Sequence, residues 1–226
     1  MFYKQNSNYT VESVTSGHPD KVCDQISDAI LDAYLALDPK SRVAVETFGG
    51  HGKLIIGGEV TSNANGEVDC IKIARGVYKE IGYADELEIS ARIVKQSPDI
   101  ALGVDTGGAG DQGIMYGFAT DETPEFLPKG VVLVHKLAKR LEEARKLGEI
   151  KWLKPDGKTQ VTYANGKLST VLVSTQHTKE VESREIEKEI TEKIINPLLS
   201  DEEKNTVKII VNPTGHFVAG GFEADT

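Results

Sequence analysis

The order of predicted elements recurs along the 226-residue chain, and this recurrence constrains the fold more than any other feature. Each half is predicted to contain a helix, a two-stranded hairpin, a second helix and a final strand. In the first half these elements are expected at 20–37, 42–48 with 53–61, about 68–81, and 87–95. In the second half they are expected at about 129–147, 159–164 with 167–175, about 180–195, and 206–211. Strands with helices on one face favour an α+β fold of two similar domains over a doubly wound parallel sheet.

The residues between these elements are typical of helix ends and turns. Pro19 suits the first position of the first helix, and Pro39 stops that helix. Asn165-Gly166 is the strongest short signal for a hairpin turn in the second half. The two domains are therefore expected at 1–103, with a mobile loop following, and at 108–221.

Two carboxylates fall within the first predicted hairpin. A four-residue turn at 49–52 would place Glu46 opposite Ile55, with Glu59 on the same face of the hairpin. Two carboxylates on one strand face could hold a cation or an ammonium group. Alternatively, this face is simply exposed to solvent.

The segment 96–113 breaks the periodicity and is rich in glycine. A loop of this length in a compact chain is usually functional or disordered. Gly107–Asp111 could cradle a phosphate, but it lacks the Gly-Lys-Ser/Thr of a P-loop and does not join a strand to a helix. We interpret the segment as a mobile lid.

The start of the first helix is a candidate anion site. Backbone donors at a helix N-terminus attract anions, and Asp20 suits such a site if Mg²⁺ bridges carboxylate and phosphate. His18 could donate a hydrogen bond to a leaving oxygen. Alternatively, these residues only cap the helix. Lys158, which follows a turn, is either a phosphate ligand or an ordinary exposed lysine.

Composition excludes several classes of protein. The formal charge is −9, so the chain lacks the basic excess of a general nucleic-acid binder. The longest purely apolar run, 131–134, is far too short to span a membrane, and no signal peptide is visible. Cys23 and Cys70 form no disulfide framework and no metal pattern. We therefore expect a cytoplasmic protein that binds neither nucleic acid nor membrane.

Several short motifs together resemble one known family, the S-adenosylmethionine synthetases (methionine adenosyltransferases). The two most specific are GHPDK at 17–21 and GAGDQG at 108–113. The others, in chain order, are DQISDAILDA at 24–33, VAVETF at 43–48, IGGEVT at 56–61, KQSPDI at 95–100, MYGFAT at 115–120, KPDGKTQVTY at 154–163, VLVSTQH at 171–177 and NPTGHF at 212–217.

The resemblance implies an enzyme that transfers the adenosyl group of ATP to the sulfur of methionine and then splits the triphosphate into phosphate and pyrophosphate. It implies Mg²⁺ and K⁺ as cofactors, with Asp20 matching a Mg²⁺ ligand and Glu46 the K⁺ ligand. Catalytic positions are matched by His18 and Lys158. ATP-binding positions are matched by His18, Asp156, Gly157, Lys158, His216, Phe217 and Asp225. Methionine-binding positions are matched by Glu59, Gln96 and Asp225, and Asp111 belongs to the family's site as well. The run from Gln96 to about Thr106 matches a gating loop.

The chain also departs from the family pattern. His216 stands where the family carries arginine. Because histidine is shorter and mostly neutral at pH 7, this change would weaken the positive charge near ATP. Residues 222–226 are expected to begin a truncated or altered C-terminal domain, so the third repeat of the fold is missing. The resemblance implies a homo-oligomer, a dimer or a dimer of dimers, with sites between subunits. The alternative is a truncated or non-catalytic subunit that needs a partner chain to complete the site.

Overall fold

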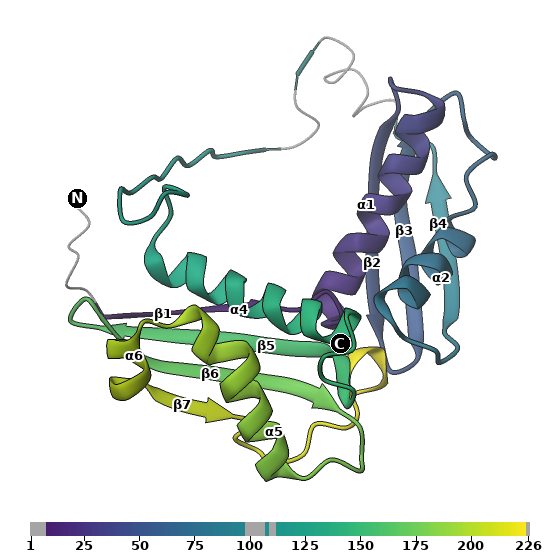
Figure 1. Ribbon diagram of the computed structural model, residues 1–226. Helices are drawn as coiled ribbons and strands as arrows, with labels where there is room; N and C mark the ends of the chain where they lie inside the picture. Colours follow the sequence, from purple (N-terminus) through teal and green to yellow (C-terminus); the bar gives the residue numbers. More distant parts are fainter. Residues whose placement is uncertain (1–7, 98–106, 109–111, 225–226) are drawn as a thin grey trace. The chain divides into compact units, whose positions relative to one another are not determined.

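The chain folds into two compact units, and the computed structural model describes residues 8–97, 107–108 and 112–224 (Figure 1). One unit contains residues 8–21 with 119–224, and the other contains the described part of 22–118. Both combine helices with a sheet, which confirms the mixed α+β content. The domain limits expected at 103 and 108 stay predictions. The first strand, however, pairs within the sheet of the second half of the chain, which is why residues 8–21 group there.

The unit 22–118 is built on a three-stranded sheet. Its elements are α1 (Pro19–Leu37), whose first residues belong to the other unit, β2 (Arg42–Gly50), β3 (Lys53–Thr61), α2 (Cys70–Ile81) and β4 (Glu88–Val94). The strand order is β2-β3-β4, with β3 antiparallel to β2 and parallel to β4. The predicted limits of α1 and β3 hold to within one residue.

One face of this sheet is covered and the other is open. Helix α1 buries apolar side chains every four residues, at Val22, Ile26, Ile30 and Tyr34. Leu54, Ile56 and Val60 of β3 are buried as well, and the Thr47 hydroxyl of β2 donates to the Cys23 carbonyl of α1 at 2.8 Å. The opposite face keeps Phe48 62% and Ile55 53% exposed. Because side chains alternate along a strand, buried and exposed residues alternate along β2 and β3.

The register of the first hairpin differs from the expected one. Glu46 pairs with Gly57, not with Ile55. The turn holds only two residues, His51 and Gly52, whose φ angles are 49° and 76°. Two successive positive φ values give the tight turn whose twist matches the strands, so pairing extends through Gly50 and the register moves by two residues. A shift of two preserves the face, and Glu59 lies on the same face as Glu46, as expected.

The second unit is built on a four-stranded sheet of order β1-β5-β6-β7. Its elements are β1 (Tyr9–Val14), α4 (Lys129–Lys146), β5 (Leu153–Ala164), β6 (Lys167–His177), α5 (Ser183–Ile190), α6 (Asp201–Thr206) and β7 (Lys208–Val211). Short turns of helix lie at Thr191–Ile195, Asn196–Leu198 and Gly221–Glu223. Strand β5 is antiparallel to both β1 and β6, and β7 is parallel to β6.

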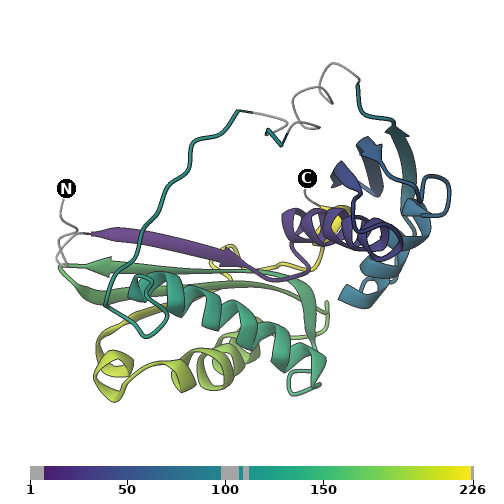
Figure 2. The ribbon, with the colours of Figure 1, turned by 90° about the horizontal axis from the view of Figure 1, so that it is seen from above.

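Helices α4 and α5 lie on the same side of this sheet (Figure 2). The core between them contains Val134, Leu137 and Leu141 of α4, Ile186 and Ile190 of α5, and Val161, Val171 and Val173 of the sheet. Both helices keep polar residues on their outer faces, as their sequences predict. None of the helices in the described ranges is both long and apolar enough to cross a membrane.

Four features of this unit differ from the sequence prediction. Strand β5 begins at Leu153, six residues before the predicted start at 159, because 154–157 reads as a turn but forms an irregularity within the strand. The helix predicted to 195 changes at Thr191 into a π-helical turn. Strand β1 and the six-residue helix α6 were not expected, since each is too short to carry a strong periodic signal.

Candidate functional site

The loop that precedes α1 packs directly on the start of β5. We call residues 15–18 the 15–18 loop. The Thr15 hydroxyl donates to the Pro155 carbonyl at 2.7 Å, and the Thr15 N–H donates to the Gly157 carbonyl at 2.9 Å. The His18 N–H in turn donates to the Thr15 carbonyl at 3.1 Å. A Cβ on Gly17 would lie 2.4 Å from the Cβ of Pro155, so only glycine fits there. These contacts bring His18 beside the Asp156–Lys158 segment.

The start of β5 is a bulge. Between the pairs Leu153–His177 and Gly157–Thr175, three residues of β5 face one residue of β6, and we call them the 154–156 bulge. Bulges bend a strand, change where its side chains point and recur beside functional sites. Here Asp156 is only 3% exposed, and its Oδ2 accepts a hydrogen bond from the Gly221 N–H at 2.7 Å.

A third segment, 212–221, lies along the end of β6. The side chain of Asn212 binds the main chain of Thr175 on both sides, accepting from its N–H at 2.8 Å and donating to its carbonyl at 3.0 Å. The Phe217 N–H donates to Nε2 of His177 at 3.0 Å. Gln176 bridges this segment to the bulge, because its Nε2 donates to Val218 O at 3.0 Å and its Oε1 accepts from Asp156 N at 3.4 Å.

The candidate residues of these three segments therefore lie within one unit. His18 from the 15–18 loop, Asp156 and Gly157 from the bulge region, and Phe217 from the 212–221 segment are linked by the hydrogen bonds above. His216 is exposed, and its ring lies 6.2 Å from that of His177, centroid to centroid.

His18 is oriented as a donor. Its Nδ1 accepts a hydrogen bond from the Asp20 N–H at 3.3 Å, so in the neutral ring the proton lies on Nε2. The His18 side chain is 16% exposed, whereas that of Asp20 is 75% exposed, with a carboxylate oxygen 3.9 Å from Nδ1. Asp20 also lies in the first turn of α1, where the helix dipole favours negative charge.

Lys158 is held by an acid that sequence reasoning missed. Its ammonium lies 3.4 Å from Oε1 of Glu12 on β1, and Nε2 of Gln160 donates to the other oxygen of Glu12 at 3.3 Å. Both partners of the ion pair are about half exposed, so the pair contributes little to stability and a stronger anion can replace Glu12. The register of β1 against β5 is what brings Glu12 close, and no spacing along the chain indicates it.

The remaining candidates lie in the other unit or outside the described residues. Glu46 and Glu59 lie on the open face of the sheet, opposite Gly57 and Ala44 respectively. Gln96 follows β4, and its Oε1 accepts from Nε of Arg42 at 3.2 Å. Asp111 and Asp225 fall outside the described residues, as does most of the glycine-rich segment. Within the described ranges, no group of three or more acidic, histidine or cysteine side chains gathers into a metal-binding cluster.

Sequence reasoning also gave no role to the buried polar residues at the end of β6. Thr175, Gln176 and His177 are polar, consecutive and at most 3% exposed. The signal was present in the sequence, since a strand end that stays polar at three successive positions departs from the alternation of a half-buried strand. The strand-end His177 proves structural, because both of its ring nitrogens make hydrogen bonds to main-chain groups.

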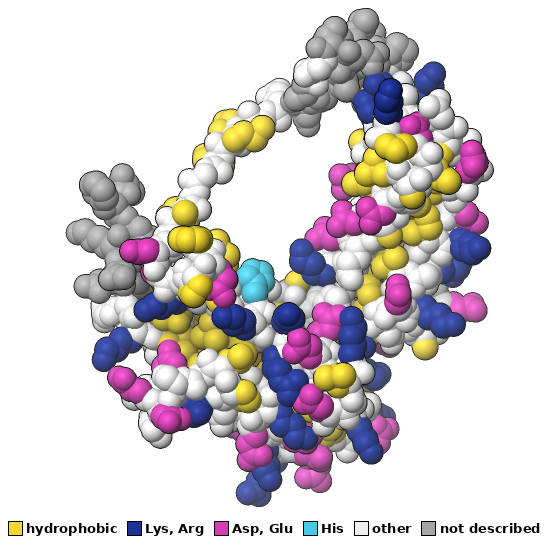
Figure 3. Space-filling view, turned by 45° about the horizontal axis from the view of Figure 1, so that its top comes forward, with side chains coloured by type: hydrophobic (Ala, Val, Ile, Leu, Met, Phe, Trp, Pro, Cys, Tyr) yellow, Lys and Arg dark blue, Asp and Glu magenta, His cyan; other side chains and the backbone are white. Residues whose placement is uncertain are grey.

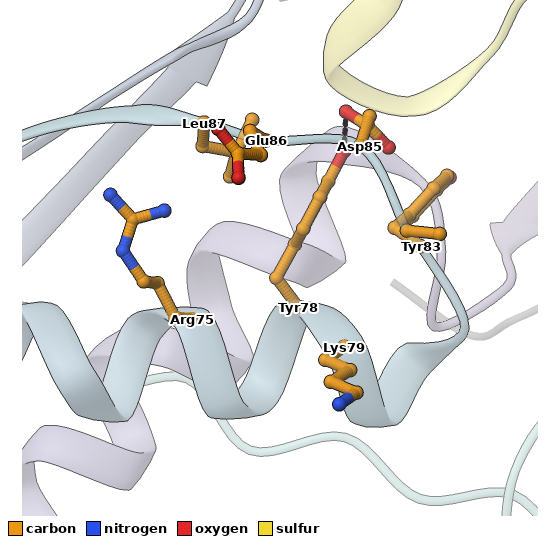
Figure 4. A pocket seen from close by; sticks show the side chains of 8 residues that line it. Arg75, Tyr78, Lys79, Tyr83, Asp85, Glu86 and Leu87 are labelled. Carbon is orange, nitrogen blue, oxygen red and sulfur yellow. Dashed lines mark hydrogen bonds between the residues drawn. The ribbon is translucent and has the colours of Figure 1, made fainter.

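A separate surface pocket of about 300 Å³ lies between α2 and the connection to β4 (Figure 4). Tyr78 and Tyr83 stack with centroids 4.7 Å apart, and the Tyr78 hydroxyl donates to Asp85 at 2.8 Å. The two rings are only 4% and 8% exposed, so they offer a ligand little surface. We interpret this pocket as a result of how the connection between α2 and β4 packs, and not as a ligand site.

Comparison with known proteins identifies the family of this chain. The profile of the S-adenosylmethionine synthetase N-terminal domain matches residues 6–100, and that of the central domain matches 106–217. The S-adenosylmethionine synthase of Parasynechococcus marenigrum is 47% identical, and those of Prochlorococcus marinus and Mesoplasma florum are each 46% identical. Each alignment covers 96% of this chain but only 60–62% of the relative. The chain therefore belongs to the S-adenosylmethionine synthetase family and spans about three fifths of the length of these relatives.

Proposed function

We propose that this chain supplies the ATP site of a methionine adenosyltransferase, which forms S-adenosylmethionine from ATP and methionine and releases phosphate and pyrophosphate. One observation carries the proposal. The three segments that the family resemblance assigns to ATP are held together by direct contacts: the 15–18 loop on the 154–156 bulge, and the bulge on the 212–221 segment. Asp225, which the resemblance also assigns to ATP and methionine, lies outside the described residues.

The residues of this site suit the departure of a triphosphate. The methionine sulfur attacks the C5′ carbon of ATP, the bond from C5′ to oxygen breaks, and the triphosphate leaves with the electron pair. His18, whose Nε2 carries the proton, would donate to the leaving oxygen. Lys158 exchanges Glu12 for a phosphate, which neutralises part of the developing charge.

The proposed ligands of the two cofactors, Mg²⁺ and K⁺, differ. Mg²⁺ usually binds one or two carboxylates together with substrate phosphates, and the exposed Asp20 at the start of α1 fits that pattern. When bound, Mg²⁺ would neutralise phosphate charge. For K⁺ the proposed ligand is the exposed carboxylate of Glu46.

We also propose the methionine contacts on residues of the unit 22–118. Glu59 and Gln96 are the candidates, and Glu59 would pair with the methionine ammonium. In support, both side chains are partly exposed. Asp111 is proposed as a further residue of the same site. The expected cytoplasmic location remains a prediction.

The repeat and the oligomer are parts of the same proposal. In each unit a helix is followed by a hairpin, another helix and a strand that runs parallel to the second strand of the hairpin. We propose that these are two copies of one unit. Exposed apolar side chains along 112–118, including Ile114, Met115 and Tyr116, support association into a homo-oligomer, a dimer or a dimer of dimers (Figure 3).

A second candidate is a subunit that cannot catalyse alone. The observation that favours it is the length of the chain, which covers only 60–62% of the relatives. In the family resemblance, further lysines that grip the triphosphate lie beyond the matched part. A partner chain that brought them would complete the site.

Turnover by the purified chain tests these two candidates. The chain is mixed with ATP, methionine, Mg²⁺ and K⁺, and S-adenosylmethionine is measured over a wide range of protein concentrations. Autonomous catalysis predicts product, with a specific activity that rises with concentration if the site needs two copies. The absence of product at every concentration would exclude autonomous catalysis, and recovery on adding a second chain would favour the subunit.

A further inference from the structure

We propose that His177 is a positioning residue of the nucleotide site. Its buried ring holds the main chain of Phe217 so that the 212–221 segment keeps its place against the 154–156 bulge. This inference rests on the proposed function, because the segment matters only if it contacts ATP. His177 is 0% exposed and cannot itself touch a ligand, so it acts through Phe217.

Two hydrogen bonds of opposite direction join the two residues. The His177 N–H donates to the Phe217 carbonyl at 2.9 Å, and the Phe217 N–H donates to Nε2 of the His177 ring at 3.0 Å. Both main-chain groups of Phe217 are thereby bound to one residue. A pair of this kind sets the distance and also the orientation of the main chain at Phe217, because it binds the peptide groups on both sides of that residue.

The other ring nitrogen fixes the form in which His177 acts. Nδ1 lies 2.8 Å from the Thr178 carbonyl, and a carbonyl can only accept, so Nδ1 carries the proton. Nε2 is then the acceptor that the Phe217 N–H requires. The contact therefore needs a neutral ring with a proton on Nδ1, and a side chain of similar size without an acceptor cannot replace it.

The neighbours of His177 explain why this contact reaches the site. Gln176, one residue earlier, links Val218 to the Asp156 main chain. A Cβ on Gly220 would lie 2.8 Å from Cδ of Gln176 and 3.1 Å from Oδ2 of Asp156, so the segment and the bulge approach closely. When Phe217 is released, the segment loses one of the contacts that hold it at this short distance.

Two substitutions separate positioning from simple loss of folding. His177→Phe keeps a ring but removes the acceptor, whereas His177→Gln keeps an acceptor that can reach the Phe217 N–H. Val161→Ala, at a fully buried position of β5, serves as the matched control that lowers stability elsewhere in the same core. Each variant of the full chain is examined for hydrogen exchange at the Phe217 amide and for its affinity for MgATP.

We expect His177→Phe to speed exchange at the Phe217 amide and to weaken MgATP binding by about tenfold, the scale of one lost hydrogen bond. His177→Gln should restore both, and Val161→Ala should change neither at temperatures where it stays folded. Unchanged exchange in His177→Phe would overturn the contact. Faster exchange with unchanged MgATP affinity would overturn the positioning role. If the unsubstituted chain bound no MgATP, the proposed function would fail together with the nucleotide role of His177. Hydrogen exchange at the Phe217 amide would still show whether His177 holds Phe217.

Discussion

Single residues at this site are constrained by contacts between parts of the chain that are far apart in sequence. Gly17 is the sharpest case, since any Cβ there would meet the side chain and the main chain of Pro155. The sequence alone showed a glycine in a recognisable motif, but its contact with Pro155 depends on three-dimensional packing. The same holds for Lys158 and Glu12, whose ion pair follows from the pairing of β1 with β5.

Replacing Gly17 with alanine should destabilise the fold. The new Cβ would lie 2.5 Å from the carbonyl carbon of Pro155, so main chain must move, at a cost of about 2 kcal/mol. Urea unfolding measures the change. Gly76→Ala is the matched control, because nothing lies within 4 Å of its Cβ position and its place inside α2 should make alanine stabilising by about 0.5–1 kcal/mol. Equal stability of the two variants would contradict the packing described for the 15–18 loop.

At the scale of elements, periodic segments were predictable and irregular ones were not. Helix α1 and strand β3 follow their apolar patterns within one residue of the expected limits. The predicted register of β2 on β3 was wrong, because the register depends on the turn. Nothing in the sequence indicated that His51 would adopt a positive φ. The start of β5 was missed because Pro155 and Asp156 are turn residues that here lie in a bulge of the strand.

The end of α5 carries a pH-dependent contact. The ammonium of Lys193 holds the pKa of Glu189 below its ordinary value, although burial opposes this, and the Trp152 indole, which donates to Glu189 at 2.6 Å, acts in the same direction as Lys193. A carboxyl whose folded pKa is lowered stabilises the protein above its unfolded pKa of about 4.3, and that stability is lost as pH falls through the folded value.

Glu189→Gln should therefore flatten the acid side of the stability profile. The amide can still accept from Trp152, but it carries no charge to lose, so the drop in melting temperature between neutral pH and about pH 3 should be smaller than in the unsubstituted chain. Glu192→Gln, at an exposed position nearby, is the control and should leave the profile unchanged. A profile that is identical in all three proteins would show that the Glu189 contact does not contribute.

At the scale of the whole molecule, the family is established and the chain spans about three fifths of the length of its relatives. Two family profiles cover residues 6–100 and 106–217, and the mixed α+β content expected from the recurring order of elements is confirmed. The roles of individual site residues stay proposals. Motifs could indicate which segments are candidates for the site, because each motif is local. They could not predict that Gln176 and His177 tie two of those segments together, because that depends on how β6 pairs with its neighbours.

The segments around His18, Lys158 and Phe217 are proposed to form one nucleotide site, and calorimetric titration with MgATP measures binding at that site. Lys158→Gln removes a cation from that site, while Lys167→Gln removes an exposed lysine from the start of β6 and serves as the control. We predict saturable binding that Lys158→Gln weakens by about tenfold, the scale of one charge-assisted contact. Lys167→Gln should leave the affinity unchanged. No binding, or equal affinity in both variants, would show that these segments do not form such a site.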